Sequence, residues 1–354
     1  MGIIEGILVF VAVILLLVVS HEFGHFFAAR FFKVRVEEFG VGIPPRLFGF
    51  RWKETFWTIN ALPLGGFVKI FGEEEDINDP QSFSARSYLV KSLIVSAGVI
   101  ANILTAFVLL TIIVGFGIPQ FTTELSAIQK GSPAEEVGMR AGDKIVNLDN
   151  HSTSAPLTVE DVQKYIAANV GTKVVIIVER NGDKIPFTLV PRRNPPEGEG
   201  ALGIVFDISI QRVPWYQIPW EGLKATYAGL QVIVAGLLFF FFQLFTTGTT
   251  PGDIVGPVGI AVIATETYRF GFIAFLQLVA LLSLNLAVIN ILPIPALDGG
   301  RIFFFVIEKI RGKVIPARVA GLIHSIFFIA LIVLLLWISW HDVINLKRYA
   351  EIFG

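Results

Sequence analysis

Two histidines separated by three residues stand near the start of the chain, in the segment His21-Glu22-Phe23-Gly24-His25. On an α-helix this spacing places both imidazoles on one face, where they can bind the same zinc ion. The intervening Glu22 would then lie beside a water molecule on the metal and could take its proton. The pattern therefore predicts a hydrolase that uses zinc.

The surroundings of this motif are strongly apolar. Every residue from Ile7 to Val19 has an apolar side chain, and about 20 such residues are enough to span a bilayer. Ionisable side chains at that depth are costly unless they face a partner or a water-filled cavity. We therefore expect a metal site inside the membrane; the alternative is a polar cluster that merely packs helices together.

A catalytic zinc site needs a third protein ligand. The chain has no cysteine, so this ligand must be a histidine or a carboxylate. The best candidate is Asp298, in the stretch Asn290 to Gly300 (NILPIPALDGG), although a carboxylate there could instead cap a helix at a Gly-Gly turn.

The same stretch contains two residues that interrupt a helix. Pro293 and Pro295 have no amide proton, so backbone carbonyl groups and the Asn290 side chain are left available. A peptide bond inside a helix is shielded, and a protease must hold its substrate extended. Asn290 and the loosened backbone are expected to do so; the alternative is that the prolines simply kink a packed helix.

The composition defines the class of protein. Of 354 residues, 54% are hydrophobic and 16% are charged, and the mean hydropathy is +0.69. These values predict a polytopic membrane protein.

No basic region precedes the first apolar segment and no small-residue cleavage site follows it, so we expect a retained helix rather than a signal peptide. The net charge of -1, without a basic cluster, argues against a nucleic acid partner.

Charge bias predicts how the chain crosses the bilayer. Four apolar segments are convincing spans, namely residues 4–30, 92–117, 273–293 and 318–340, and a fifth candidate is 226–246. Arg30 to Lys91 contains nine Lys and Arg residues and Arg301 to Arg318 contains five, so both stretches should be cytoplasmic. An even number of crossings must then separate them. The segments 92–117 and 273–293 already supply two, so we expect 226–246 to lie in the outer interface or to form a re-entrant element that does not cross the membrane. With four spans, Asp298 lies at the same depth in the membrane as His21 and His25.

A soluble domain is expected between the second span and the fifth candidate. The segments Gln129 to Ala134 and Gly138 to Ile145, followed by an apolar run from Val174 to Val178, resemble the PDZ domain of bacterial proteases. A helix is predicted from Val159 to Ala168 and a turn at residues 181–183. PDZ domains bind an extended peptide or a chain terminus by strand addition, although the fold alone would also suit an inert spacer.

Together these motifs resemble the site-2 protease family of zinc intramembrane proteases, in the branch of the bacterial regulator of sigma-E protease. The resemblance is carried by His21 to His25, by Asn290 to Gly300, by the small-residue run Ser96 to Asn102 and by the PDZ-like insertion. It covers nearly the whole chain. It also includes Gly256 to Gly259, which looks like the family's glycine-proline turn before the third span.

The resemblance implies roles for individual residues. It makes His21, His25 and Asp298 the zinc ligands, Glu22 the general base and Asn290 a substrate-holding residue. Zinc is the metal by family expectation, since two histidines and one carboxylate also suit iron. A membrane-associated β-sheet is implied at residues 34–72, in which Gly65 and Gly66 would offer an edge to the substrate; the alternative is a surface hairpin anchored by Phe48, Phe50 and Trp52.

The predicted fold is a polytopic α-helical membrane protein with four transmembrane helices, a membrane-associated β-sheet and an inserted extracytoplasmic α/β PDZ domain. The expected parts are a first transmembrane helix at 1–33, a cytoplasmic-side sheet and loop at 34–91, a second helix at 92–120, the PDZ domain at 121–196, a linker with a membrane-surface or re-entrant helix at 197–271, a third transmembrane helix at 272–312 and a fourth with the C-terminal tail at 313–354.

The resemblance implies an endopeptidase that cleaves the transmembrane segment of single-span membrane proteins, such as an anti-sigma factor or a remnant signal peptide, in stress signalling by regulated intramembrane proteolysis. It places the protein in the bacterial cytoplasmic (inner) membrane, in contact with the lipid bilayer. The alternatives are an inactive PDZ-bearing scaffold and a metal-ion transporter. Of the other histidines, we expect His324 to be a packed polar residue, His341 to be interfacial and His151 to be exposed.

Overall fold

The computed structural model describes residues 3–73, 75, 77–149, 157–196, 198–248 and 255–344. His151 lies outside these residues. The chain forms two compact units, one from residues 1–115 and 215–354 and the other from residues 116–214. Each unit is considered by itself below.

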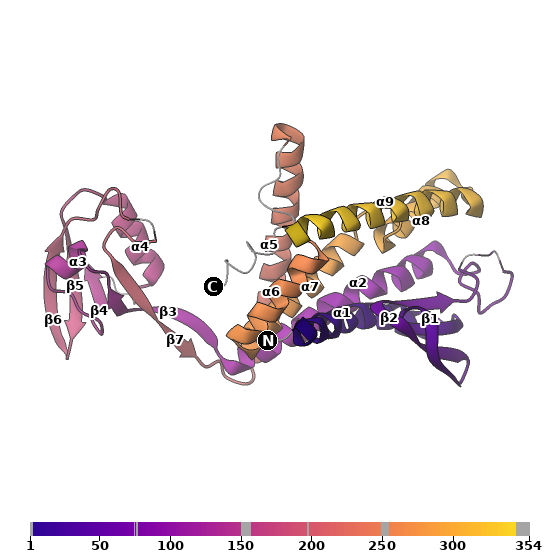
Figure 1. Cartoon of the computed structure of the whole chain (residues 1–354), viewed down its shortest axis with the longest axis horizontal. Coiled ribbons are helices and arrows are strands. Elements are labelled where there is room, and N and C mark those ends of the chain that lie inside the picture. Colours follow the sequence, from indigo (N-terminus) through magenta and orange to yellow (C-terminus); the bar gives the residue numbers. More distant parts are fainter. Residues whose placement is uncertain are drawn as a thin grey trace. The chain divides into compact units, whose positions relative to one another are not determined.

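The larger unit is built from long apolar helices and one strand pair (Figure 1). Its elements are α1 (Ile3–Phe31), β1 (Val36–Trp52), β2 (Thr55–Ile70), α2 (Tyr88–Phe116), α5 (Ile218–Thr247), α6 (Pro257–Phe270), α7 (Phe272–Asn290), α8 (Asp298–Arg311) and α9 (Ala317–Ile344).

Five helices in the described residues are long and apolar enough to cross a membrane. They are Leu8–Phe31, Tyr88–Phe116, Ile218–Thr247, Phe272–Asn290 and Arg318–Ile344. These helices qualify by length and composition alone. One of them is α5, which contains the fifth candidate segment 226–246. The helix α5 begins at Ile218, eight residues before that segment.

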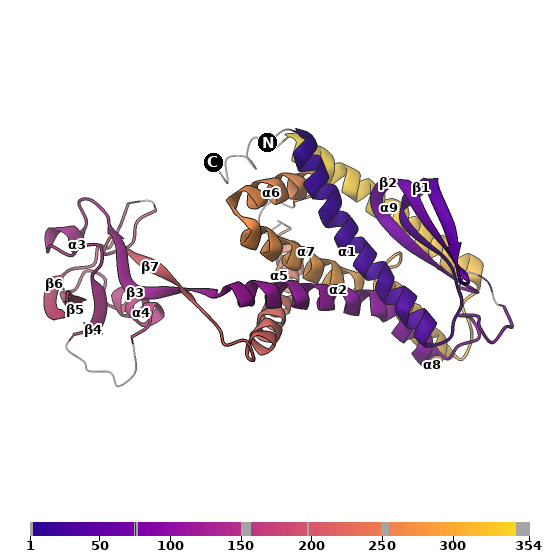
Figure 2. The same cartoon turned by 90° about the horizontal axis from the view of Figure 1, so that it is seen from below.

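The orientation of α5 differs from that of the other long helices. In Figure 1 α5 runs across α1, α2 and α9 rather than alongside them, and in Figure 2 it is strongly foreshortened while α1 and α2 are seen lengthwise. Its N-terminal half contacts α2 closely, since a Cβ placed on Gly222 would overlap the side chain of Thr111. Gly222 thus allows α5 to cross directly over α2.

The helices α1 and α2 pack at very short range. A Cβ on Gly24 would overlap the carbonyl oxygen of Ala97 and lie 2.9 Å from the Cβ of Ala101. Small residues at such a crossing let two helix backbones approach within a membrane, where apolar burial alone gives no driving force. The turn of α1 from His21 to His25 is therefore packed directly against α2.

The strand pair forms a curled antiparallel ribbon alongside α1, as both views show (Figures 1 and 2). The first part of β1 pairs with both ends of β2, because Phe39 lies opposite both Val68 and Trp57. The end of β2 at residues 66–70 pairs with β1 on one side only among the described residues. Its other side is an open strand edge.

A buried carboxylate on α9 binds the N-terminus of α6. Asp342, on α9, accepts hydrogen bonds from the backbone N–H groups of Gly256 (3.1 Å) and Gly259 (2.9 Å). These amides lie at the N-terminus of α6, where a helix has unpaired donors and favours negative charge. The Gly256 to Gly259 turn thus connects α6 to α9.

Among the residues that the structure describes, the smaller unit forms a five-stranded sheet with two helices. Its elements are β3 (Ile118–Ile128), α3 (Pro133–Glu136), β4 (Lys144–Leu148), α4 (Val159–Ala168), β5 (Val174–Arg180), β6 (Asp183–Leu189) and β7 (Ile204–Gln211). The strand order is β6-β5-β4-β3-β7, and a capping box at Thr158 and Asp161 starts α4. The predicted helix from Val159 to Ala168 is confirmed, and the apolar run from Val174 to Val178 lies within β5.

Candidate active site

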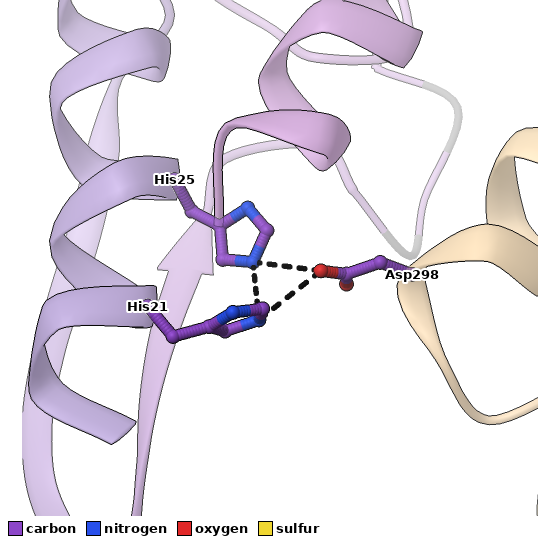
Figure 3. Close-up of side chains that lie close together, drawn as sticks. All are labelled: His21, His25 and Asp298. Atoms are coloured by element: carbon purple, nitrogen blue, oxygen red, sulfur yellow. Dashed lines mark hydrogen bonds and ion pairs between the residues drawn. The ribbon is translucent and has the colours of Figure 1, made fainter. Parts of the chain in front are cut away.

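Two histidines and an aspartate meet at one point of the helical unit (Figure 3). His21 and His25 lie one turn apart on α1, and Asp298 is the first residue of α8. The Asp298 Oδ2 atom lies 3.1 Å from Nε2 of His21 and 3.3 Å from Nε2 of His25. The two Nε2 atoms are 3.2 Å apart. The structure thus brings together residues 273 positions apart in the sequence.

Residues of α2 contact the Nδ1 atoms of both imidazole rings. Nδ1 of His25 lies 3.0 Å from the carbonyl oxygen of Ile94, to which it donates a hydrogen bond. Nδ1 of His21 lies 3.3 Å from the side-chain amide of Asn102. With both Nδ1 atoms engaged, both Nε2 atoms face Asp298. A carbonyl partner of this kind orients a histidine that binds a metal, and Asn102 does the same for His21 when its amide oxygen, rather than its nitrogen, faces Nδ1.

Asn102 is fully buried and connects three helices. Besides His21 on α1, its side chain accepts a hydrogen bond from the Ser20 hydroxyl group (3.2 Å). Its backbone carbonyl accepts one from the Ser283 hydroxyl group on α7 (2.8 Å). A buried side chain with this many partners is fixed in position, and it fixes the ring of His21 in turn.

Gly98 makes room for the two rings. A Cβ on Gly98 would lie 2.5 Å from Nε2 of His25 and 2.6 Å from Cε1 of His21. Ile94, Gly98 and Asn102 follow one another at intervals of four, so they form a single stripe along α2. That stripe is the wall of the site opposite Asp298.

Glu22 lies between the two histidines in sequence and is half-buried. The end of β2 approaches it, because a Cβ on Gly66 would lie 3.2 Å from Cγ of Glu22 and 3.2 Å from the carbonyl oxygen of Gly40. Gly65 lies next to it and would bring a Cβ within 3.2 Å of the Ile43 side chain. The strand that carries the open edge of the ribbon therefore packs against Glu22 at Gly66.

The remaining candidates lie around the turn that precedes α8. Asn290 is the last residue of α7 and is half-buried, Pro293 is exposed and Pro295 is half-buried. A Cβ on Gly299 would overlap the carbonyl oxygens of residues 291 and 292, so the start of α8 packs directly on this turn. The turn thus sets the position of Asp298.

The three converging groups suit a metal ion. One donor atom from each of His21, His25 and Asp298 lies within 4.8 Å of the others, and no second group of this kind occurs among the described residues. Oδ2 of Asp298 is buried and has no hydrogen-bond partner in the described part of the chain. Two imidazole nitrogens and one carboxylate oxygen form a ligand set typical of catalytic zinc, with a fourth position left for water or substrate.

Sequence reasoning missed the part that α2 plays. Asn102 entered only as the end of a small-residue run, and Ile94 and Gly98 were given no role. The available signal was the spacing: a glycine and an asparagine four apart in an otherwise apolar helix, since intramembrane polar residues usually face a partner.

The fold and the site define a membrane-embedded metallohydrolase, and the comparisons with known proteins agree. The model of Peptidase family M50 matches residues 9–334. A zinc metalloprotease of Clostridium acetobutylicum is 34% identical over 93% of this chain and 94% of its own length. One from Nostoc sp. is 33% identical over 89% of each. A membrane metalloprotease of Arabidopsis thaliana, described as chloroplastic, is 31% identical over 99% of this chain and 81% of its own length.

The chain therefore belongs to Peptidase family M50, the site-2 protease family. It is a multi-pass membrane protein and a zinc-dependent metalloendopeptidase. The predicted family, activity and metal are thus confirmed. The membership disfavours the scaffold and the transporter as alternatives.

Proposed function

We propose that this protein cleaves peptide bonds within the transmembrane segments of single-span membrane proteins. The observation that carries the proposal is the convergence of His21, His25 and Asp298 at the end of an apolar helix. In this proposal those three residues hold zinc, and Glu22 is the general base.

Zinc supplies Lewis acidity when bound, which activates a water molecule and polarises the scissile carbonyl group. Glu22 accepts a proton from the attacking water at its carboxylate and delivers it to the nitrogen of the leaving amine. The partners on α2, Ile94 and Asn102, keep both Nε2 atoms directed at the metal. The peptide bond is split into a carboxylate and an amine.

Substrate binding is assigned to the strand edge and the turn that border the site. The open edge of β2 at Gly65 and Gly66 belongs to the strand that packs against Glu22, and an extended substrate can add to such an edge through backbone hydrogen bonds. Asn290, Pro293 and Pro295 are assigned to the opposite border, where the interrupted helix leaves backbone groups available. The substrate would thus be unwound between a strand edge and a turn.

The proposed topology has four spans, α1, α2, α7 and α9, with α5 in the outer interface. Its support is the excess of basic residues at 30–91 and 301–318, together with the course of α5 across the other long helices (Figure 1). The smaller unit is assigned as an extracytoplasmic PDZ domain that binds a peptide or a chain terminus. The proposed location is the bacterial cytoplasmic membrane, and the proposed role is stress signalling by cleavage of an anti-sigma factor or a remnant signal peptide.

Labelling of single cysteines tests this topology, because the chain has none of its own. Lys224→Cys and Thr246→Cys lie near opposite ends of α5 and are exposed. Both should react with an impermeant maleimide added from outside, whereas Lys309→Cys on α8 should react only after permeabilisation. Reaction of the two α5 positions from opposite sides would show that α5 spans.

The catalytic proposal is tested by Glu22→Gln, with a reporter whose single transmembrane segment is the substrate. The variant should accumulate normally and retain zinc while it leaves the reporter intact. Glu54→Gln is the matched control, because Glu54 is an exposed residue whose ion pair with Arg30 contributes little. Cleavage by Glu22→Gln would remove Glu22 from its assigned role.

A further inference from the structure

The turn before α8 contains a residue in an unfavourable backbone conformation. Ala296 has a φ angle of 81°, in the left-handed region that residues other than glycine, asparagine and aspartate seldom adopt. It lies two residues before Asp298. A conformation of this kind persists only when surrounding contacts hold it.

One contact reaches this turn from a distant helix. The backbone N–H of Ala296 donates a hydrogen bond to Nδ1 of His324, on α9, over 2.9 Å. Because Nδ1 accepts, the ring proton lies on Nε2. The ring of Phe304, on α8, packs edge-on against His324 with the centroids 5.3 Å apart. His324 thus lies, half-buried, between the turn and α8.

His324 has a costly place in the sequence. It stands in an apolar helix, Ala317–Ile344, of which most side chains are exposed in the structure. A polar ring at such a position needs a partner, and an unpaired amide in the apolar interior is equally unfavourable. The hydrogen bond satisfies both groups, so breaking it would leave two unsatisfied groups and a strained turn.

We propose that His324 is a positioning residue that holds Ala296 in its left-handed conformation and thereby places Asp298 against His21 and His25. The inference rests on the proposed function, since it assumes that Asp298 is a metal ligand. The two histidines are positioned by α2, whereas Asp298 arrives on a separate element. Its position depends on the turn, and the turn depends on α9.

Three substitutions separate this role from general packing. His324→Leu removes the acceptor but suits an apolar helix. His324→Asn keeps an acceptor, because Oδ1 of asparagine is as many bonds from the backbone as Nδ1 of histidine. Ala296→Gly removes the penalty of the left-handed conformation, so it should rescue His324→Leu in the double variant. Ser325→Leu, at the next position of α9, is the matched control for added apolar bulk.

The first measurement is zinc affinity of the detergent-purified protein, by competition with a chelator. We expect His324→Leu to weaken binding by about tenfold or more, the usual effect of losing a residue that orients a ligand. His324→Asn, Ser325→Leu and the double variant should lie close to wild type. Cleavage by His324→Leu should recover as zinc is raised to saturation. Wild-type affinity in His324→Leu, or equal losses in all His324 variants without rescue by Ala296→Gly, would overturn the proposal.

The second measurement does not depend on the metal. Hydrogen exchange at residues 296–298 of the zinc-free protein should be faster in His324→Leu than in wild type and in Ser325→Leu. Equal exchange would overturn the positioning role even if the protein is a zinc protease. Faster exchange in a protein that binds no zinc would instead overturn the proposed function and leave the role of His324 in the turn standing.

Discussion

Nδ1 of His25 lies 3.0 Å from the carbonyl oxygen of Ile94, across the contact between α1 and α2. A backbone carbonyl of an apolar helix thus orients a histidine of the candidate metal site. It can do so because Gly24 and Gly98 carry no side chains at the points where the two helices come closest. The close packing of α1 against α2 and the geometry of the site are therefore the same feature.

Gly98→Ala should disrupt the metal site through the contact of α2 with the two histidine rings. Its methyl group would lie 2.5 Å from Nε2 of His25, so the ring must turn away or the helices must separate. We expect zinc affinity to fall at least about tenfold and cleavage to fall with it, as measured by chelator competition and a membrane reporter. Gly115→Ala, on the same helix, meets its nearest neighbour only at 4.0 Å and should behave as wild type. Equal zinc affinity in the two variants would refute the argument.

Asn102→Leu should weaken metal binding without removing a ligand. The substitution leaves Nδ1 of His21 without its partner, and loss of such a partner typically costs 10- to 100-fold in metal affinity. Asn285→Leu is the control, because Asn285 is half-buried and its amide bonds only to its own helix at Leu281 in the described structure. If both variants bind zinc equally well, Asn102 does not orient His21.

The substrate should cross-link to the edge of β2 with the period of a strand. A cysteine at Gly65, combined with Glu22→Gln to retain the substrate, would be paired with single cysteines along the substrate's transmembrane segment. Disulfides should form at alternate substrate positions, since side chains of a strand alternate between its faces. Formation at intervals of three or four would mean that the substrate is helical when it meets this edge.

The free energy of unfolding of the smaller unit should depend on pH because of the Asp143 carboxyl group. Burial favours a higher pKa for Asp143, but hydrogen bonds from Arg180 and from the Arg140 amide outweigh it and hold the pKa below its usual value. The stabilisation is therefore present above the unfolded pKa of about 3.9 and is lost as the pH falls through the folded value.

Hydrogen exchange of β5 in the full chain measures this contribution. At neutral pH Asp143→Asn should reduce protection by an amount equivalent to about 2 kcal/mol, a value discounted from that of a fully buried pair because Arg180 is partly exposed. The difference between wild type and variant should begin to shrink as the pH falls below about 3.9 and should be lost as it passes through the lowered pKa of folded Asp143. A difference that is constant with pH would exclude the ion pair as its cause.

Sequence reasoning located the parts of the site that depend on local spacing. His21 and His25 share a helix face because they are four residues apart, and this requires no knowledge of the fold. Asp298 was placed beside them by counting membrane crossings and by family resemblance. The structure brings the three together, while their roles as ligands remain proposals.

Features that depend on how helices meet were not predictable in the same way. The partnership of Asn102 with His21 requires the register of α2 against α1, which apolar periodicity leaves open. His324 was expected to be a packed polar residue, but its partner is the amide of Ala296, in a left-handed turn that an alanine does not signal. The break between α7 and α8 was indicated by Pro293 and Pro295, whereas α6 was expected only as a glycine-proline turn.

The most direct test of the central claim is the position of the bond that the protein cleaves. Purified protein in liposomes would be given a single-span substrate, and the products would be identified by mass spectrometry. The account predicts two fragments whose new ends lie within the apolar span. It also predicts that cleavage is abolished by Glu22→Gln and by a zinc chelator and is restored when zinc is returned. Cleavage only outside the span, or unchanged cleavage by Glu22→Gln, would contradict it.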